Sequence, residues 1–174
     1  GSAHGIAKLI KHLYFDRYRC VGIKGNLWYG FTNHRWMESE CGTGLREKYS
    51  SVVSQMFITK QNEIIANIRS DDNMSAELQD TLTSQAAIYN KISMRLRDAP
   101  KKNQILTESK ELHYDKNLIM KLDENPHVMC FTNGVYDFEQ QLFRDGIPED
   151  YVSKCTGVEY VDIKKEENKK IVLL

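Results

Sequence analysis

Apolar residues in the first forty positions predict a short helix followed by a small antiparallel sheet. Residues 4–15 place isoleucine and leucine three or four positions apart, which is the spacing of an amphipathic helix. Runs rich in aromatic and β-branched side chains follow at about 19–24, 27–31 and 35–38, separated by glycine-containing turns. We therefore expect one helix and then a three-stranded meander.

The middle of the chain carries the apolar pattern of long helices. Within residues 45–68, and again within 76–97, an apolar residue recurs every three or four positions. The polar segment at 70–75 separates these two predicted helices, and Pro100 is expected to end the second because proline cannot continue a helix. Two shorter helices are expected within 101–124.

The last third returns to strand patterns. Apolar runs at 128–131, 135–138 and 142–144, with turns expected at Asn133-Gly134 and at 139–141, predict a second meander. The predicted fold class is therefore α+β, mainly helical with two small antiparallel β-meanders.

One domain is expected over residues 3–163. Pro148 suits the first position of a short helical turn within it. A charged run and the apolar letters IVLL close the sequence, so residues 164–174 are expected to begin a helix that leads into a further domain.

Composition predicts a soluble globular protein, and the distribution of charge indicates a candidate basic face. Of the 174 residues, 41% are apolar and 28% are charged, which is ordinary for a soluble globular protein. No stretch approaches the roughly 20 apolar residues of a membrane span, so we expect a soluble, intracellular protein with no membrane partner. The net charge is zero, yet residues 1–36 hold six Lys or Arg against one acid, and the rest holds 18 bases against 23 acids. The N-terminal part is therefore a candidate basic face.

Sequence motifs of catalysis and metal binding are not found. The four cysteines lie far apart and predict free thiols in a reducing compartment rather than a zinc site. Residues 42–48 lack the spacing of a phosphate loop, and the GxxG letters at 22–25 fit a hairpin turn better than a nucleic-acid clamp. A nuclease using Asp137, Glu149 and Asp150 lacks any metal-ligand pattern. We expect no catalytic residue and no metal.

Nucleic acid is the ligand class that the basic residues favour. Near the N-terminus they alternate with tyrosine and tryptophan, and a β surface of this kind is typical of single-strand binding proteins. A second basic cluster closes the helix predicted at 76–97, where the helix dipole also favours cations. The rings either stack on bases or fill the core, and the charges either contact phosphates or are only solvated. The candidate nucleic-acid-binding residues are Lys8, Lys11, Arg17, Arg19, Lys24, Trp28, Arg35, Lys91, Arg95, Lys101 and Lys102.

Two stretches of the sequence resemble a known family. LWYGFTNHRW, at 27–36, is similar to the aromatic meander of the pre-helicase domain of poxvirus-type primase–helicases, which occur in large DNA viruses and are related to phage and plasmid primases. LDENPHVMCFTNGVYDFEQQLFRDGIPEDYVSKCTGVEY, at 122–160, resembles the family's ordered signature of NP, NGVYD, R, PED, TG and Y. With the helical middle, the resemblance covers about residues 6–163.

The resemblance implies a place in viral DNA replication. In that family the domain lies between a primase and a superfamily 3 AAA+ helicase ring, usually a homo-hexamer, so residues 164–174 would lead into the helicase. It implies ATP, magnesium and hydrolase activity for the parent protein, none of them for this fragment, and a location in the host cytoplasm or viral factory.

The expected role is a non-catalytic linker or collar module between primase and helicase. Its basic face would contact single-stranded or forked DNA. The alternative is a purely structural inter-domain or oligomerisation module that never touches DNA.

Overall fold

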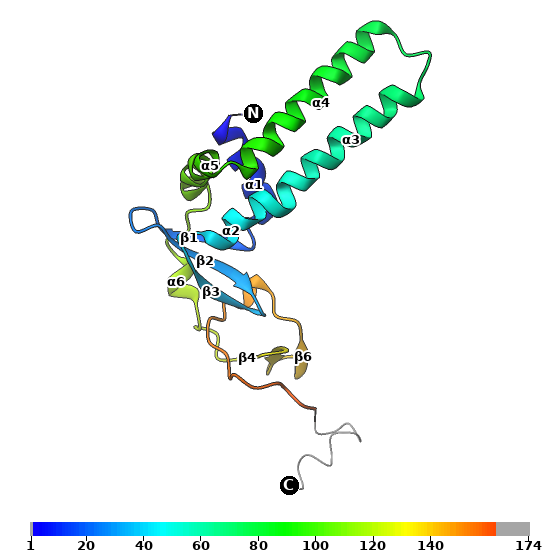
Figure 1. The fold of residues 1–174 in the computed structure, drawn as a ribbon. Helices are drawn as coiled ribbons and strands as arrows, with labels where there is room; N and C mark the ends of the chain where they lie inside the picture. Colours follow the sequence, from blue (N-terminus) through cyan, green and yellow to red (C-terminus); the bar gives the residue numbers. More distant parts are fainter. Residues whose placement is uncertain (1, 163–174) are drawn as a thin grey trace.

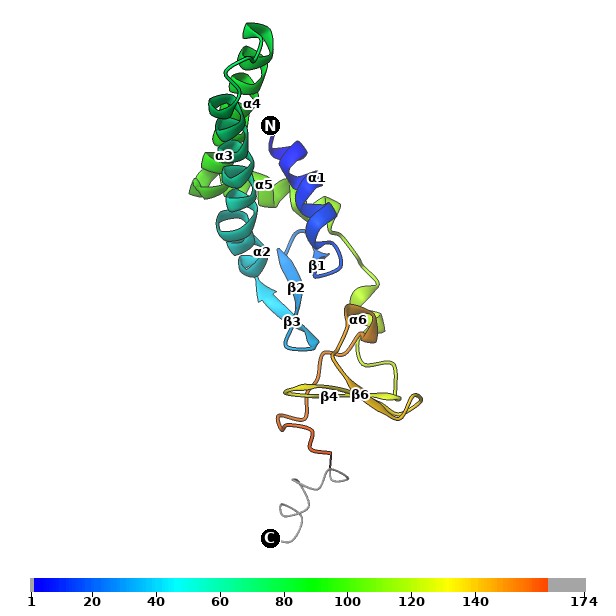
Figure 2. The same ribbon diagram turned by 90° about the vertical axis from the view of Figure 1, so that its right-hand side faces the viewer.

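The computed structural model describes residues 2–162, and the chain is elongated in both views (Figures 1 and 2). Two long helices, α3 (Ser54–Ser70) and α4 (Ala76–Arg97), form a hairpin that makes one end. A sheet of three strands lies in the middle, and a second sheet of three strands makes the other end. The predicted α+β class with two antiparallel meanders is confirmed, while the helix expected at 164–174 falls outside the described residues.

The N-terminal elements form as their apolar pattern predicts. Helix α1 (Ala3–Tyr14) begins at Ser2, whose hydroxyl accepts the Gly5 N–H at 3.1 Å. The first sheet has the order β1-β2-β3, from β1 (Tyr18–Gly22), β2 (Leu27–Thr32) and β3 (Arg35–Glu40). Asn33 and His34 join β2 to β3 as a two-residue turn, and both have positive φ, as a tight hairpin with right-handed twist requires.

The helical middle departs from the prediction at two points. The region predicted as one long helix is α2 (Thr43–Lys48), a π-helical turn η1 (Tyr49–Val53) and then α3. The predicted end of α4 at Arg97 is confirmed, but Pro100 lies within the next helix: Asp98 separates the two, and its carboxylate accepts the Lys101 N–H at 3.0 Å and starts α5 (Ala99–Leu112). The proline stands in the first turn of α5, where its missing N–H costs no hydrogen bond.

The main core lies where α1, α5 and the base of the hairpin cover the first sheet. It includes Trp28, Tyr49 and Leu96, each with no exposed surface. The Tyr49 hydroxyl donates to Ser109 Oγ at 3.0 Å, which satisfies a polar group that burial would otherwise penalise. Burial raises the pKa of Tyr49 well above its ordinary value.

The second sheet has the order β4-β5-β6, from β4 (Val128–Phe131), β5 (Gly134–Asp137) and β6 (Leu142–Arg144). Phe131 pairs with Gly134, so the two turn residues are Thr132 and Asn133, and the predicted Asn133-Gly134 turn is displaced by one position. Gly134 is the first residue of β5, where a Cβ would lie 2.6 Å from Phe143 Cζ. The glycine is needed for close approach to the neighbouring strand.

The two sheets are joined through Trp36 and the segment after β6. The short 3-10 helix η2 (Pro148–Asp150) and the one-turn helix α6 (Leu118–Lys121) lie between them. Trp36 Nε1 donates to the Pro148 carbonyl at 2.8 Å, and the Trp36 backbone N–H donates to Val152 at 2.7 Å. The predicted helical turn at Pro148 is confirmed.

Candidate nucleic-acid interface

The second basic cluster gathers at the corner between α4 and α5. Arg95 and Lys101, from the two helices, line a small hollow of about 70 Å³ against the first residues of α1. Lys101 is exposed, and Lys91, one turn before Arg95 on α4, is exposed as well. Lys102 is half-buried. We call Lys91, Arg95 and Lys101 the α4–α5 corner.

The first basic cluster comes from several elements, and two of its members, Lys11 and Arg19, contact the same Phe15 ring. Lys8 on α1 and Lys24 in the β1–β2 loop are exposed, while Lys11 is half-buried. Arg17 is exposed, and its guanidinium lies 5.5 Å from the centre of the Phe31 ring. These side chains come from different elements and hold no common hollow among those described.

Arg19 is held inside the fold. Its guanidinium carbon lies 3.7 Å from the centre of the Phe15 ring, and its Nε lies 3.6 Å from an Asp115 carboxylate oxygen. Only 15% of the side chain is exposed, and burial lowers the pKa of Arg19 against the opposing effect of Asp115. The cation joins the end of α1 to the loop after α5, so its charge is already balanced within the molecule.

The Trp28 and Arg35 side chains are less accessible than the exposed lysines. The Trp28 side chain has no exposed surface, and its ring N–H donates to Asn26 Oδ1 at 3.1 Å. Its ring therefore has no free face for a base, and it belongs to the core. Arg35 is half-buried at the start of β3, and its Nε is buried without a hydrogen-bond partner.

His113 is a core histidine. It has no exposed surface, its Nδ1 lies 3.0 Å from the Ser109 carbonyl, and its ring packs 5.7 Å from that of Trp28. Burial lowers the pKa of His113 to about 4, so the ring is neutral at pH 7. Its role is in packing.

The acidic residues of the C-terminal signature serve the fold. Arg144 donates to both oxygens of Asp150, at 2.7 and 2.8 Å, and to Asp137 at 3.2 Å. Asp150 also accepts the Ile147 N–H at 2.8 Å. Both carboxylates are buried, and no group of three His, Cys, Asp or Glu within residues 2–162 is arranged to hold a metal ion. The acids that a nuclease would use are thus already engaged, apart from the exposed Glu149.

Sequence reasoning missed the part that Arg144 plays. The three residues of this ion-pair network come from β5, β6 and η2, so their meeting depends on the tertiary fold and not on a repeat within one element. The only available signal was the fixed order of an acid, an arginine and an acid in the signature segment.

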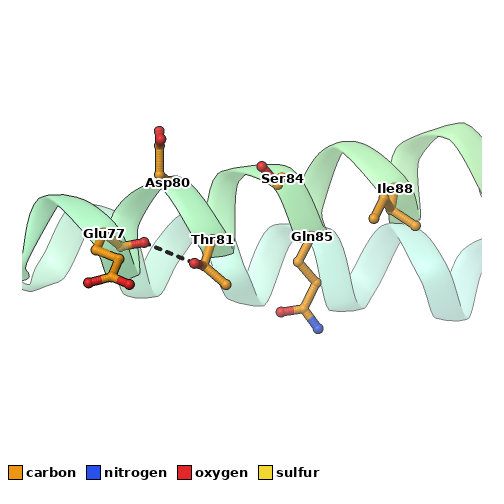
Figure 3. Close-up of a pocket in the computed structure, with 6 residues that line it drawn as sticks. All are labelled: Glu77, Asp80, Thr81, Ser84, Gln85 and Ile88. Carbon is orange, nitrogen blue, oxygen red and sulfur yellow. Dashed lines mark hydrogen bonds between the residues drawn. The ribbon is translucent and has the colours of Figure 1, made fainter.

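A further hollow, of about 590 Å³, lies along the outer face of α4 (Figure 3). All of its lining residues project from this one helix, and they include Glu77 and Asp80 but no Lys or Arg. The Thr81 hydroxyl donates a hydrogen bond to the Glu77 carbonyl of its own helix at 2.9 Å. Its negative charge makes this hollow unsuited to phosphate.

The fold and its basic corner define a class of small α+β module, a helical hairpin set on two β-meanders. The chain belongs to the family described as "D5 N terminal like", whose profile matches residues 7–172. None of the helices formed by residues 2–162 combines the length and the apolar character that a membrane crossing requires.

Two viral relatives extend this likeness over nearly the whole chain. The sequence is 34% identical over 166 residues, 95% of this chain, to a protein of Acanthamoeba polyphaga mimivirus named "Putative helicase L207/L206". It is 27% identical over 188 aligned positions, 92% of this chain, to "Putative helicase 022R" of Frog virus 3 (isolate Goorha). The chain spans only 17% and 19% of the length of these relatives.

Proposed function

We propose that this chain is a non-catalytic module of a viral DNA-replication primase–helicase, linking the primase to the AAA+ helicase ring. The observation that carries the proposal is membership of a family shared with viral proteins named as helicases. Since the chain matches less than a fifth of those proteins, ATP, magnesium and the homo-hexameric ring belong to the parent in this proposal.

DNA contact is the second part of the proposal, and the α4–α5 corner is its site. Lys91 and Lys101 are exposed on adjacent helices, and Arg95 lines the same hollow as Lys101. Exposed lysines on two adjacent helices suit the phosphates of a single strand or fork, which supply most of the sequence-independent affinity. Arg19 is not included, since its charge is balanced by Asp115.

The DNA part is tested by binding across a salt series. We would measure the anisotropy of fluorescent single-stranded and forked DNA with the wild-type chain and with Lys91→Gln/Lys101→Gln. Each lost phosphate contact lowers the slope of log affinity against log salt by about 0.7 for a single strand, so the double variant should lose roughly 1.4.

A matched control removes the same charge elsewhere. Lys60→Gln/Lys116→Gln changes two exposed lysines, of which Lys60 is paired with Glu63 at 2.7 Å on α3. This control should keep the wild-type slope. Equal losses in both double variants would show that only total charge matters, and affinity independent of salt would remove DNA contact from the proposal.

A purely structural module is the second candidate, and exposed apolar side chains favour it. On α4, Leu78, Ile88 and Met94 are 48%, 52% and 60% exposed. Exposed apolar side chains on a protruding hairpin suit contact with protein, because they gain from leaving water. A cryo-EM map of the full-length parent would distinguish the candidates, since one leaves the α4–α5 corner facing DNA and the other buries it in protein.

A further inference from the structure

Two cysteines from distant parts of the sequence meet beside the second sheet. Cys130 of β4 is 3% exposed, and Cys155, five residues after η2, is half-buried against the same apolar cluster. The Thr156 N–H donates to the Cys130 carbonyl at 2.9 Å, which fixes the backbone at residue 155 next to β4. Both thiols are free.

The two thiols share one apolar cluster and line one hollow. Burial raises the pKa of Cys130 to about 11, and the neighbouring Cys155 contributes to the shift. The Gly157 N–H donates to Cys155 Sγ at 3.5 Å and fixes that sulfur from its other side. The Thr156–Cys130 backbone hydrogen bond holds the two cysteines side by side, which is the placement that a disulfide requires.

The segment that carries Cys155 is bound along β4 beyond the cysteine. The Thr132 N–H donates to the Val158 carbonyl at 3.0 Å. The Asn133 side chain makes two hydrogen bonds with the Tyr160 backbone, at 2.8 and 3.1 Å. We call residues 153–162 the C-terminal strap. All of these contacts are non-covalent, so the strap can leave β4 without breaking a covalent bond.

We propose that Cys130 and Cys155 are an oxidisable pair, which a small-molecule disulfide such as oxidised glutathione converts to a disulfide that locks the C-terminal strap onto β4. Both cysteines line an open hollow of about 400 Å³, through which a reagent reaches them. Cys41, although exposed, has no thiol neighbour among the described contacts, and Cys20 is buried in the main core.

The exchange proceeds in two balanced steps. The thiolate of the more exposed Cys155 attacks one sulfur of the oxidant, forms a mixed disulfide and releases one thiolate, which takes up a proton. The Cys130 thiolate then attacks the Cys155 sulfur and releases the second thiol. In total two protein thiols are oxidised to one disulfide, and one small-molecule disulfide is reduced to two thiols that carry both protons.

The test is thiol counting after treatment with oxidised glutathione, followed by denaturing alkylation and peptide mass spectrometry. Of the four thiols in the chain, two should remain alkylatable, and a linked peptide pair should join Cys130 to Cys155. The melting temperature should rise by about 5 °C or more, because the bridge closes a loop in the unfolded chain. A reductant should reverse both changes.

Two variants separate this pair from the other thiols. Cys41→Ser should still form the bridge, whereas Cys155→Ser should form none and show no rise in melting temperature. Glutathione adducts without the linked pair, or a bridge that involves Cys41 or a second chain, would overturn the proposal. Cys155→Ser should still fold, because the side chain is only half-buried, and circular dichroism would verify this. The absence of a bridge in that variant can then be assigned to the missing thiol.

Discussion

Replacing Arg144 by methionine should selectively weaken the second sheet. Met keeps most of the length of the side chain but removes the two hydrogen bonds to Asp150 and the one to Asp137. The Asp150 side chain is 5% exposed, so its carboxylate would remain buried with the Ile147 N–H as its remaining hydrogen-bond donor among the described residues.

The size of the loss follows from that stranded charge. Breaking a buried ion pair on one side costs about 3–5 kcal/mol, and the lower end applies here because the Arg144 side chain is 24% exposed and already partly hydrated. Arg144→Lys keeps the charge without the fork that grips both oxygens, so it should fall between wild type and Arg144→Met.

The assay combines urea unfolding with amide hydrogen exchange. Unfolding gives the free-energy change, and exchange should accelerate at Val135 and Tyr136 in β5 while the α3–α4 hairpin keeps its protection. The control is Arg69→Met on the exposed end of α3, which should stay within about 0.5 kcal/mol of wild type. If Arg144→Met were as stable as that control, the ion-pair network would have no structural role, and Asp137 and Asp150 would again be candidates for a different role.

The remaining predictions concern one glycine and one histidine. Gly134→Ala should cost about 1–3 kcal/mol in urea unfolding, because the new methyl group would lie 2.6 Å from Phe143, whereas Gly25→Ala, with open space around it, should change far less. His113 has a folded-state pKa of about 4, below its ordinary value, so its neutral form stabilises the protein above pH 6.5 and this contribution is lost as the pH falls toward 4. This residue should make the free energy of unfolding in urea about 2 kcal/mol smaller at pH 5 than at pH 7. The difference should persist in the control His12→Gln, which changes an exposed histidine. Equal free energies at the two pH values would contradict a neutral His113.

Local patterns predicted most of the elements but not their ends. The periods of three to four residues in helices and two in strands arise from which side of an element meets the core, so α1, α4 and both meanders are visible in the sequence. The end of α4 at Arg97 was predicted, but the place of Pro100 inside α5 was not, because a proline in the first turn of a helix and a helix-ending proline give similar local signals. The one-position shift of the turn at Asn133 depends on strand register, which is decided by long-range packing.

The candidate interface was predicted less well, for a physical reason. A cation in a sequence does not say whether its counter-charge is a ligand or another part of the same fold. Arg19 is balanced by Asp115, ninety-six positions along the chain, and Trp28 is covered by helices that precede and follow the first sheet in the sequence. Only the placement of Lys91 and Arg95 on one face could be predicted from spacing, since helix geometry brings residues four positions apart to the same face.

The residues that best identify the family by sequence are therefore poor candidates for its contacts. The signature side chains form their hydrogen bonds with one another and with nearby backbone, as Asp137, Arg144 and Asp150 show, and Gly134 is required by the approach of β6. A signature made of such residues indicates that the second sheet can form, and it carries no information on what the module binds. Binding has to be sought on side chains that the fold leaves exposed, which is why the DNA experiment is directed at Lys91 and Lys101 rather than at the signature.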